Sequence, residues 1–252
     1  MFEILILSLV QGVTEFLPIS SSSHLIIISE YLNFQNNDLS IDVSLHIGSF
    51  IAVITYFHKD FLRFVENREL FLKILVSSIP IIFVGFLLVK TEYIENLRNI
   101  QIIGWMTFIF GVLLYISDKF NLEKNIENNF NYKTAIIIGI FQVVSLVPGV
   151  SRSGIAITAS RILNFKRFDS AKISFLLSIP TLGAVTIYGI QEIVTSDDLN
   201  FSVLNIISIL LSFIFSLVTM RFFLKYIQNF SLNLFVTYRI ILGLGLIYLA
   251  YL

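Results

Sequence analysis

QGVTEFLPISSSSH, residues Gln11–His24, is the most informative segment of this chain for its architecture. It lies between two apolar runs, 1–10 and 25–28, yet it contains a carboxylate, a proline, four consecutive serines and a histidine. A charged side chain at the centre of a bilayer costs at least about 2.5 kcal/mol, so such residues are rare there and usually functional. Pro18 cannot continue a helix that enters from the N-terminal side, and Ser20–Ser23 are good residues to begin a second one. The stretch therefore predicts a broken helix whose turn lines a polar cavity, because irregular backbone survives at membrane depth only in a wet cavity or inside protein.

Composition places this break in a membrane protein. Of the 252 residues 56% are hydrophobic and only 13% are charged, and the mean hydropathy is +0.85. These values exclude an ordinary soluble domain and predict a protein with several membrane spans, and the net charge of zero gives no reason to expect nucleic acid. The absence of cysteine excludes disulfides and cysteine ligands. The N-terminal run has no basic residue before it and no small-residue cleavage site, so we expect a retained helix and not a signal peptide.

A second break divides a later apolar run. PGVSRSG, residues Pro148–Gly154, interrupts the segment 134–163. Polar loops separate the rest of the chain into six predicted spans, at about 43–57, 74–89, 102–116, 173–190, 203–224 and 234–252. The six residues Leu75–Pro80 faintly resemble Leu176–Pro180, which suggests an internal repeat.

The charges of the loops predict how the chain crosses the membrane. Loops rich in Lys and Arg belong in the cytoplasm, and they are 59–73, 118–133, 161–172 and 221–239. Loops without basic residues belong outside, and they are 33–42 and 191–200, with 90–98 outside by alternation. Segment 134–163 must then enter from the cytoplasm and return to it, whereas 1–31 ends outside.

Together these patterns predict an all-α polytopic membrane protein with an inverted-topology repeat. About six transmembrane helices and two re-entrant helical hairpins form a single integral membrane domain, 1–252, whose halves are about 1–117 and 134–252. Paired helix interruptions in such repeats point to the binding site. Two ordinary kinked helices are the alternative to the re-entrant hairpins.

If the two breaks meet, they bring the components of phosphoryl transfer into one cavity. Glu15 is the candidate ligand for a hard divalent cation, Mg²⁺ or Ca²⁺, and Arg152 offers a planar fork for phosphate oxygens. Ser21 or Ser20 supplies a hydroxyl, and His24 can lie on the same helical face as a general acid or base. Ser151 and Ser153 flank the arginine, and helix N-termini at both breaks would also bind phosphate. A site at membrane depth predicts a substrate with a lipid tail and a phosphorylated head.

Several of these residues also have a purely structural interpretation. Glu15 and Arg152 can neutralise each other as an ion pair, and serines in membrane helices often only pack or bond to carbonyls. His46 is interpreted as a packing or cavity histidine, and no two histidines have the spacing of zinc ligands. Arg221 and Arg239 are expected near helix ends, with their side chains reaching to the interface.

The two interrupted motifs, Gln11–His24 and Pro148–Gly154, resemble the signatures of the undecaprenyl-diphosphate phosphatase family of the bacitracin-resistance type. The resemblance extends over essentially the whole chain. It implies a multi-pass protein of the bacterial plasma (inner) membrane that removes a phosphate from a polyprenyl diphosphate, recycles the lipid carrier for cell-wall synthesis and confers bacitracin resistance. It also implies dependence on a divalent cation and the inverted-repeat fold, and it allows a homodimer.

Carried over to this chain, the resemblance implies four catalytic residues, with Glu15 also the metal ligand. They are Glu15, Ser21, His24 and Arg152. The implied substrate-binding residues are Gln11, Ser20, Ser151, Ser153 and Gly154. The chain departs from the family pattern at three positions: Gln11 stands where many members have a second glutamate, Ser23 where a glycine is usual, and Ala156 where a threonine is usual, although Thr158 lies close by.

The rival hypothesis is a carrier. Opposed broken helices are typical of secondary transporters, so a transporter or flippase for a phosphorylated lipid or anion would use the same architecture. A transporter needs the anion site but not a base beside a hydroxyl, so Ser21 and His24 favour hydrolysis. A lipid phosphatase of the soluble-phosphatase-like type would need further arginine and histidine motifs that the sequence lacks.

Overall fold

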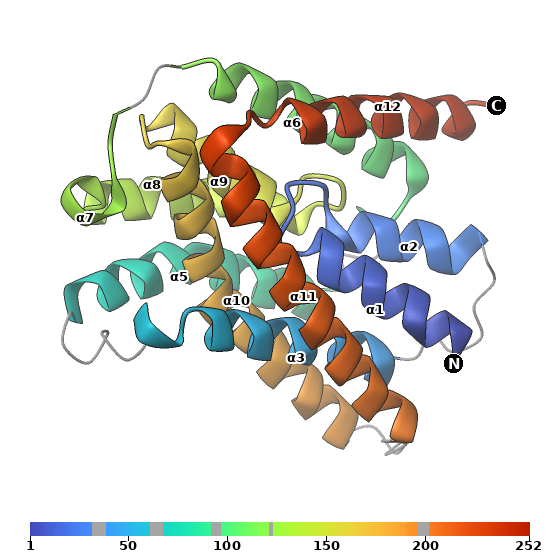
Figure 1. The fold of residues 1–252 in the computed structure, drawn as a ribbon. Coiled ribbons are helices and arrows are strands. Elements are labelled where there is room, and N and C mark those ends of the chain that lie inside the picture. The colour runs from blue at the N-terminus through green and yellow to red at the C-terminus, as the bar shows by residue number, and fades with distance from the viewer. Residues whose placement is uncertain (32–38, 61–67, 92–96, 121–122, 196–201) are drawn as a thin grey trace.

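The computed structural model describes residues 1–31, 39–60, 68–91, 97–120, 123–195 and 202–252. Its regular structure is helical there, apart from a β-bridge between Lys124 and Phe165. Figure 1 shows the helices, which are α1 (Phe2–Thr14), α2 (Ser21–Tyr31), α3 (Leu39–Tyr56), α5 (Arg68–Lys90), α6 (Ile100–Asp118), α7 (Ile126–Asn129), α8 (Tyr132–Val143), the 3₁₀ turn η2 (Val144–Leu146), α9 (Arg152–Ile162), α10 (Arg167–Thr195), α11 (Val203–Asn229) and α12 (Asn233–Ala250).

Six of the described helices are long and apolar enough to cross a membrane. They are α3, α5, α6, α10, α11 and α12. Each coincides with one of the six spans predicted from the sequence, so the expectation of an all-helical, multi-pass membrane protein is confirmed. Parts of the loops used to predict orientation lie outside the described residues, namely 33–38, 61–67, 92–96, 121–122 and 196–200.

Both interrupted segments consist of two short helices joined by a turn. In the first, α1 ends at Thr14, four residues before Pro18, and α2 begins at Ser21. In the second, α8 passes through η2 and α9 begins at Arg152. The residue before each second helix is a serine with positive φ, 76° at Ser20 and 71° at Ser151. Non-glycine residues rarely adopt this conformation, and it costs about 1–3 kcal/mol, so the surrounding structure must hold both turns in place.

The two segments are built into the bundle in matching ways. α1 packs mainly against α11, and α8 packs mainly against α5. Each contact depends on a glycine: a Cβ at Gly12 would collide with Phe215, and a Cβ at Gly139 would collide with the backbone of Ser77. α6 and α12 lie side by side along their length (Figure 1).

The sequence similarity between Leu75–Pro80 and Leu176–Pro180 does not relate matching helices. The first lies in α5, the second long helix after α1–α2, whereas the other lies in α10, the first long helix after α8–α9. The expectation that this similarity marks the repeat is therefore wrong.

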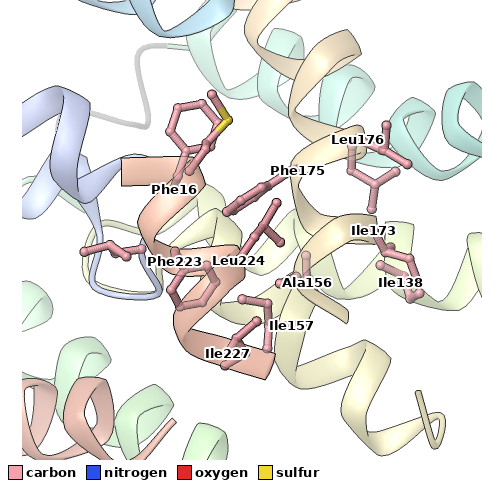
Figure 2. Close-up of a cluster of buried hydrophobic side chains, with 14 of the residues drawn as sticks. Phe16, Ile138, Ala156, Ile157, Ile173, Phe175, Leu176, Phe223, Leu224 and Ile227 are labelled. Carbon is pink, nitrogen blue, oxygen red and sulfur yellow. The ribbon is translucent and has the colours of Figure 1, made fainter. Parts of the chain in front are cut away.

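A buried aromatic cluster fixes the first turn against the long helices. Figure 2 shows Phe16 beside Phe175 of α10, which in turn lies beside Phe223 of α11. The rings of Phe16 and Phe175 meet edge to face with their centroids 5.3 Å apart, and Phe16 is fully buried. Lipid is as apolar as the protein interior, so at membrane depth such contacts stabilise through the close packing of the rings. Since Phe16 directly follows Glu15, this packing also fixes the position of the carboxylate.

Candidate active site

The carboxylate of Glu15 is the centre of the candidate site. It is 7% exposed. Arg152 donates from Nη2 to Oε1 at 2.9 Å, and the Ser21 hydroxyl donates to Oε2 at 2.6 Å. Gln11 Nε2 also donates to Oε2, at 3.2 Å. The structure therefore brings three other predicted site residues around the buried Glu15 carboxylate, and one of them, Arg152, comes from the second motif, 137 positions away.

The second turn is bound directly to the first. The Ser153 hydroxyl donates to the Leu17 carbonyl at 2.7 Å. Ser151 caps α9 by accepting from the Gly154 N–H at 3.1 Å, and its Oγ lies 3.2 Å from that of Ser153. The predicted binding residues Ser151, Ser153 and Gly154 thus shape the turn that presents Arg152. Thr158, which lies near the position where a threonine is usual, donates to the Gly154 carbonyl at 2.9 Å.

Arg239 holds both turns from α12, and this overturns the expectation that its side chain reaches to the membrane interface. It lies well inside the helix and is 0% exposed. Nη1 donates to the Pro18 carbonyl at 3.1 Å, and Nη2 donates to the carbonyls of Gly149 and Val150 at 2.8 and 3.0 Å. Nε donates to a fourth carbonyl, that of Thr107, at 3.3 Å. No carboxylate of the described residues forms an ion pair with Arg239, so its charge is offset by carbonyl dipoles.

Among the described residues, His24 does not hydrogen-bond to the Ser21 hydroxyl, although the sequence suggests that the two side chains could act together. Its Nδ1 lies 2.6 Å from the Ser20 carbonyl and its Nε2 lies 2.6 Å from the Tyr238 hydroxyl. Because a carbonyl only accepts, Nδ1 must donate, and in the neutral ring Nε2 then accepts the tyrosine proton. Within the part of the chain that the structure describes, the partner of the Ser21 hydroxyl is Glu15 and not His24.

A cavity of about 410 Å³ opens beside the Glu15–Arg152 pair. His46 also lines it, with Nδ1 held at 2.9 Å by the Asp42 carbonyl. Two buried polar atoms at this centre have no hydrogen-bond partner among the described residues, Nη1 of Arg152 and Oε1 of Gln11. The remaining walls are mostly apolar and come largely from α5 and α10, through Ile81, Ile82, Gly85, Phe86, Val89, Leu146, Leu182, Ala184, Val185 and Tyr188.

The oxygen atoms of this centre fit a hard cation only together with ligands from outside the protein. The described residues contain no group of three or more His, Cys, Asp or Glu side chains that could hold a metal ion. The Glu15 carboxylate and the unpartnered Oε1 of Gln11 are oxygen donors of the kind that Mg²⁺ and Ca²⁺ prefer. Since Mg²⁺ usually takes one or two carboxylates plus phosphate and water, this donor set fits a cation that arrives with a phosphorylated substrate.

The interpretation of His46 as a packing or cavity histidine agrees with its place on the cavity wall. Two other residues of this centre escape sequence reasoning: no motif singles out Tyr238, and Arg239 is expected at the interface but lies inside the bundle. A signal existed for Arg239, because it interrupts an apolar run and an ionisable residue inside a membrane segment is a candidate functional residue by default. No local pattern marks Tyr238, whose contact with His24 joins residues 214 positions apart.

The sequence of this chain is similar to a known protein family and to several named proteins over nearly its whole length. Residues 4–245 match the family described as Bacitracin resistance protein BacA. The undecaprenyl-diphosphatase of Pelagibacter ubique (strain HTCC1062) is 48% identical over 251 residues, covering 99% of this chain and 97% of that protein. Undecaprenyl-diphosphatase 1 of Pseudoalteromonas translucida (strain TAC 125) is 39% identical, covering 97% of each chain. The undecaprenyl-diphosphatase of Jannaschia sp. (strain CCS1) is 35% identical, covering 100% of this chain and 99% of that protein. A match of this length, with both interrupted motifs inside it, shows that the chain belongs to the bacitracin resistance protein BacA family.

Proposed function

We propose that this protein hydrolyses undecaprenyl diphosphate to undecaprenyl phosphate and inorganic phosphate. The observation that carries the proposal is the Glu15 carboxylate, which accepts from the Ser21 hydroxyl and from the Arg152 guanidinium beside a largely apolar cavity. The names of its relatives support the same substrate. The reaction would return the lipid carrier to cell-wall synthesis and so confer resistance to bacitracin.

Glu15 and Ser21 would generate the nucleophile. The Ser21 hydroxyl donates its proton to Glu15 as its oxygen attacks the terminal phosphorus, and the bond from that phosphorus to the bridging oxygen breaks. The polyprenyl phosphate leaves with the bonding electrons, and water then hydrolyses the phosphoserine to release phosphate and restore the hydroxyl. The 2.6 Å hydrogen bond already directs the hydroxyl proton toward the carboxylate that would accept it.

Arg152 would stabilise the charge that builds up on the transferred phosphoryl group. Its Nη2 is bonded to Glu15, and its Nη1 is free of any described partner, so it can bind a phosphate oxygen without breaking the ion pair. In phosphoryl transfer, positioning and charge neutralisation account for most of the rate acceleration. A divalent cation bound by Glu15 would neutralise further phosphate charge.

The walls of the cavity support a lipid substrate. Phe86 of α5 and Val185 and Tyr188 of α10 line it and are themselves exposed on the lipid-facing surface. A diphosphate at Glu15 could therefore extend its prenyl chain between α5 and α10 into the bilayer without crossing polar surface.

The finer architecture predicted from the sequence is part of the same proposal. α1 has 13 residues and α9 has 11, which at 1.5 Å per residue gives lengths of about 20 and 17 Å, too short for a hydrocarbon core of about 30 Å. The two helices of each segment also pack against each other, α1 with α2 and α8 with α9, as the arms of a hairpin do. This packing favours re-entrant hairpins over kinked spanning helices. The matching contacts of α1 with α11 and of α8 with α5 support an inverted repeat of two halves. We place the protein in the bacterial plasma membrane. All lining residues of the cavity come from one chain, so a homodimer is allowed but is not needed to complete it.

Phosphate release by the purified protein from undecaprenyl diphosphate tests the proposal. We expect turnover in the presence of Mg²⁺ or Ca²⁺, loss of turnover with chelator, and a matched loss in Ser21→Ala and Glu15→Gln. Ser22→Ala is the control, since Ser22 is exposed beside Ser21. Absence of phosphate release from the folded wild type with any cation, together with uptake of the lipid into vesicles, would replace the hydrolase by the carrier.

A further inference from the structure

A second basic pocket lies at the far end of α9 from the candidate active site. Arg152 begins α9 and Arg161 lies in its last turn, so the two arginines are separated by about 14 Å along the helix axis. The pocket has a volume of about 510 Å³ and lies where the ends of α6, α9 and α11 meet the start of α10. Its lining residues are Asp118, Lys119, Phe120, Arg161, Lys166, Arg167, Phe168, Ile227 and Gln228.

The charges of this pocket do not balance. Four cationic side chains line it, Lys119, Arg161, Lys166 and Arg167, against the single carboxylate of Asp118. Asp118 pairs with Arg167 at 2.7 Å and with Arg161 at 3.3 Å. One carboxylate cannot neutralise two guanidinium groups and two ammonium groups, so the pocket has an excess of positive charge.

The buried arginine adds an unpaired donor. Arg161 is 4% exposed, and its two terminal nitrogens donate to the carbonyls of Phe165, Asp118 and Phe120. Its Nε has no hydrogen-bond partner among the described residues. Burial lowers the pKa of Arg161 to about 10, so it remains charged at neutral pH. A charged group held this deep, with a donor unused, adds a fixed positive field to the pocket.

The pocket combines apolar walls with exposed lysines, as expected for a site at the boundary between membrane and water. Phe120 is 49% exposed at its rim, and Phe168 and Ile227 provide further apolar wall. Lys119 and Lys166 are exposed there. Basic pockets at helix ends on the cytoplasmic side of membrane proteins bind anionic lipid headgroups, and the loop charges assign this end of the bundle to the cytoplasm.

We propose that this pocket is a binding site for a phosphate group, distinct from the candidate active site. Lys119 and Lys166 contact the anion from the rim, and the Arg161–Arg167 pair supplies positive charge behind them. A phosphate monoester or diester group fits this chemistry, and it can belong to an anionic phospholipid or to free inorganic phosphate.

Binding to purified protein tests this site with two probes. Lys119→Gln/Lys166→Gln is the test variant, because neither lysine takes part in the Asp118 ion pairs. Lys225→Gln is the matched control, since it removes an exposed lysine from the same end of α11 without lining the pocket. One arm counts the phosphatidylglycerol molecules retained by native mass spectrometry, and the other measures binding of inorganic phosphate by calorimetry.

The results of the two binding measurements distinguish a lipid headgroup, free phosphate and the absence of a site. We expect the wild type and Lys225→Gln to retain one more phosphatidylglycerol than the double variant, at an affinity at least ten times that for phosphatidylcholine. Loss of phosphatidylglycerol alone identifies a lipid headgroup, whereas an equal loss of inorganic phosphate binding identifies free phosphate as a ligand. Equal retention and equal phosphate binding in all three proteins would overturn the proposal. Phosphate release from undecaprenyl diphosphate in phosphatidylcholine should be unchanged in the double variant, so this test is independent of the proposed hydrolysis.

Discussion

Replacement of Arg239 by methionine should displace the two turns that form the candidate active site relative to each other. The substitution keeps most of the apolar stem but removes the donors that Arg239 supplies to the carbonyls of Pro18, Gly149, Val150 and Thr107. Three of these four carbonyls belong to the turns themselves. Because Ser153 also joins the turns through Leu17, we expect them to shift and not to separate completely.

The size of the effect follows from two opposing contributions. Leaving three buried carbonyls unsatisfied costs about 1–3 kcal/mol each. Removing a buried guanidinium that has no carboxylate partner returns several kcal/mol of desolvation, so the net loss of stability should be small. The loss of positioning is not offset, and a displacement of about 1 Å between reacting groups can cost about 100-fold in rate. We therefore expect kcat/KM to fall about 100-fold, which corresponds to about 2.7 kcal/mol.

The assay is steady-state phosphate release, with thermal unfolding and size-exclusion chromatography as checks of folding. Arg239→Lys keeps the charge, but one ammonium group cannot contact the carbonyls of both turns, so an intermediate loss of about 10-fold is expected. Arg221→Met is the control, because Arg221 is exposed on α11. A folded Arg239→Met protein with kcat/KM within about threefold of wild type would refute the view that Arg239 positions the site.

Three other predictions concern the same centre. Arg152→Lys should lower kcat by about 100-fold or more, because a single ammonium cannot hold Glu15 and a phosphate oxygen in one plane; an unchanged kcat would remove Arg152 from the site. Gly149→Ala should abolish activity or folding, since Gly149 has φ of 100° and a Cβ would lie 2.7 Å from the Ile103 carbonyl; wild-type activity and melting temperature would contradict this. Tyr238→Phe removes one hydrogen bond to His24, so the rate of phosphate release should fall by about 3- to 10-fold. A loss as large as that of Arg152→Lys would instead give Tyr238 a role in the chemistry.

Much of the candidate site could be predicted from the sequence because its residues are polar or charged and interrupt otherwise apolar segments. Glu15 and Arg152 lie at interruptions of apolar runs, and a membrane segment tolerates such groups only where they are paired or solvated. Both lie where the sequence placed them, at turns between short helices, and they contact each other at 2.9 Å. The six spans followed from hydropathy alone, because their length is set by the thickness of the bilayer.

Contacts between distant elements were beyond the reach of sequence patterns. Helical spacing correctly allowed Ser21 and His24 to lie on one helix, but spacing could not show that Ser21 turns to Glu15 while His24 turns to Tyr238. The choice depends on the turn geometry at Ser20 and on the placement of α12, neither of which leaves a local periodicity.

Apolar length and helix breaking are local properties of the chain, so its sequence is enough to predict a helical membrane protein with two interrupted segments. How the interruptions are held together depends on contacts that form only in the folded protein. Arg239 is separated from Pro18 by 221 positions in the chain, and it became a link between the turns only when α12 packed beside them. The physical reason is that carbonyls left free by broken helices need donors, and the chain can supply those donors from any helix that the fold brings within about 3 Å.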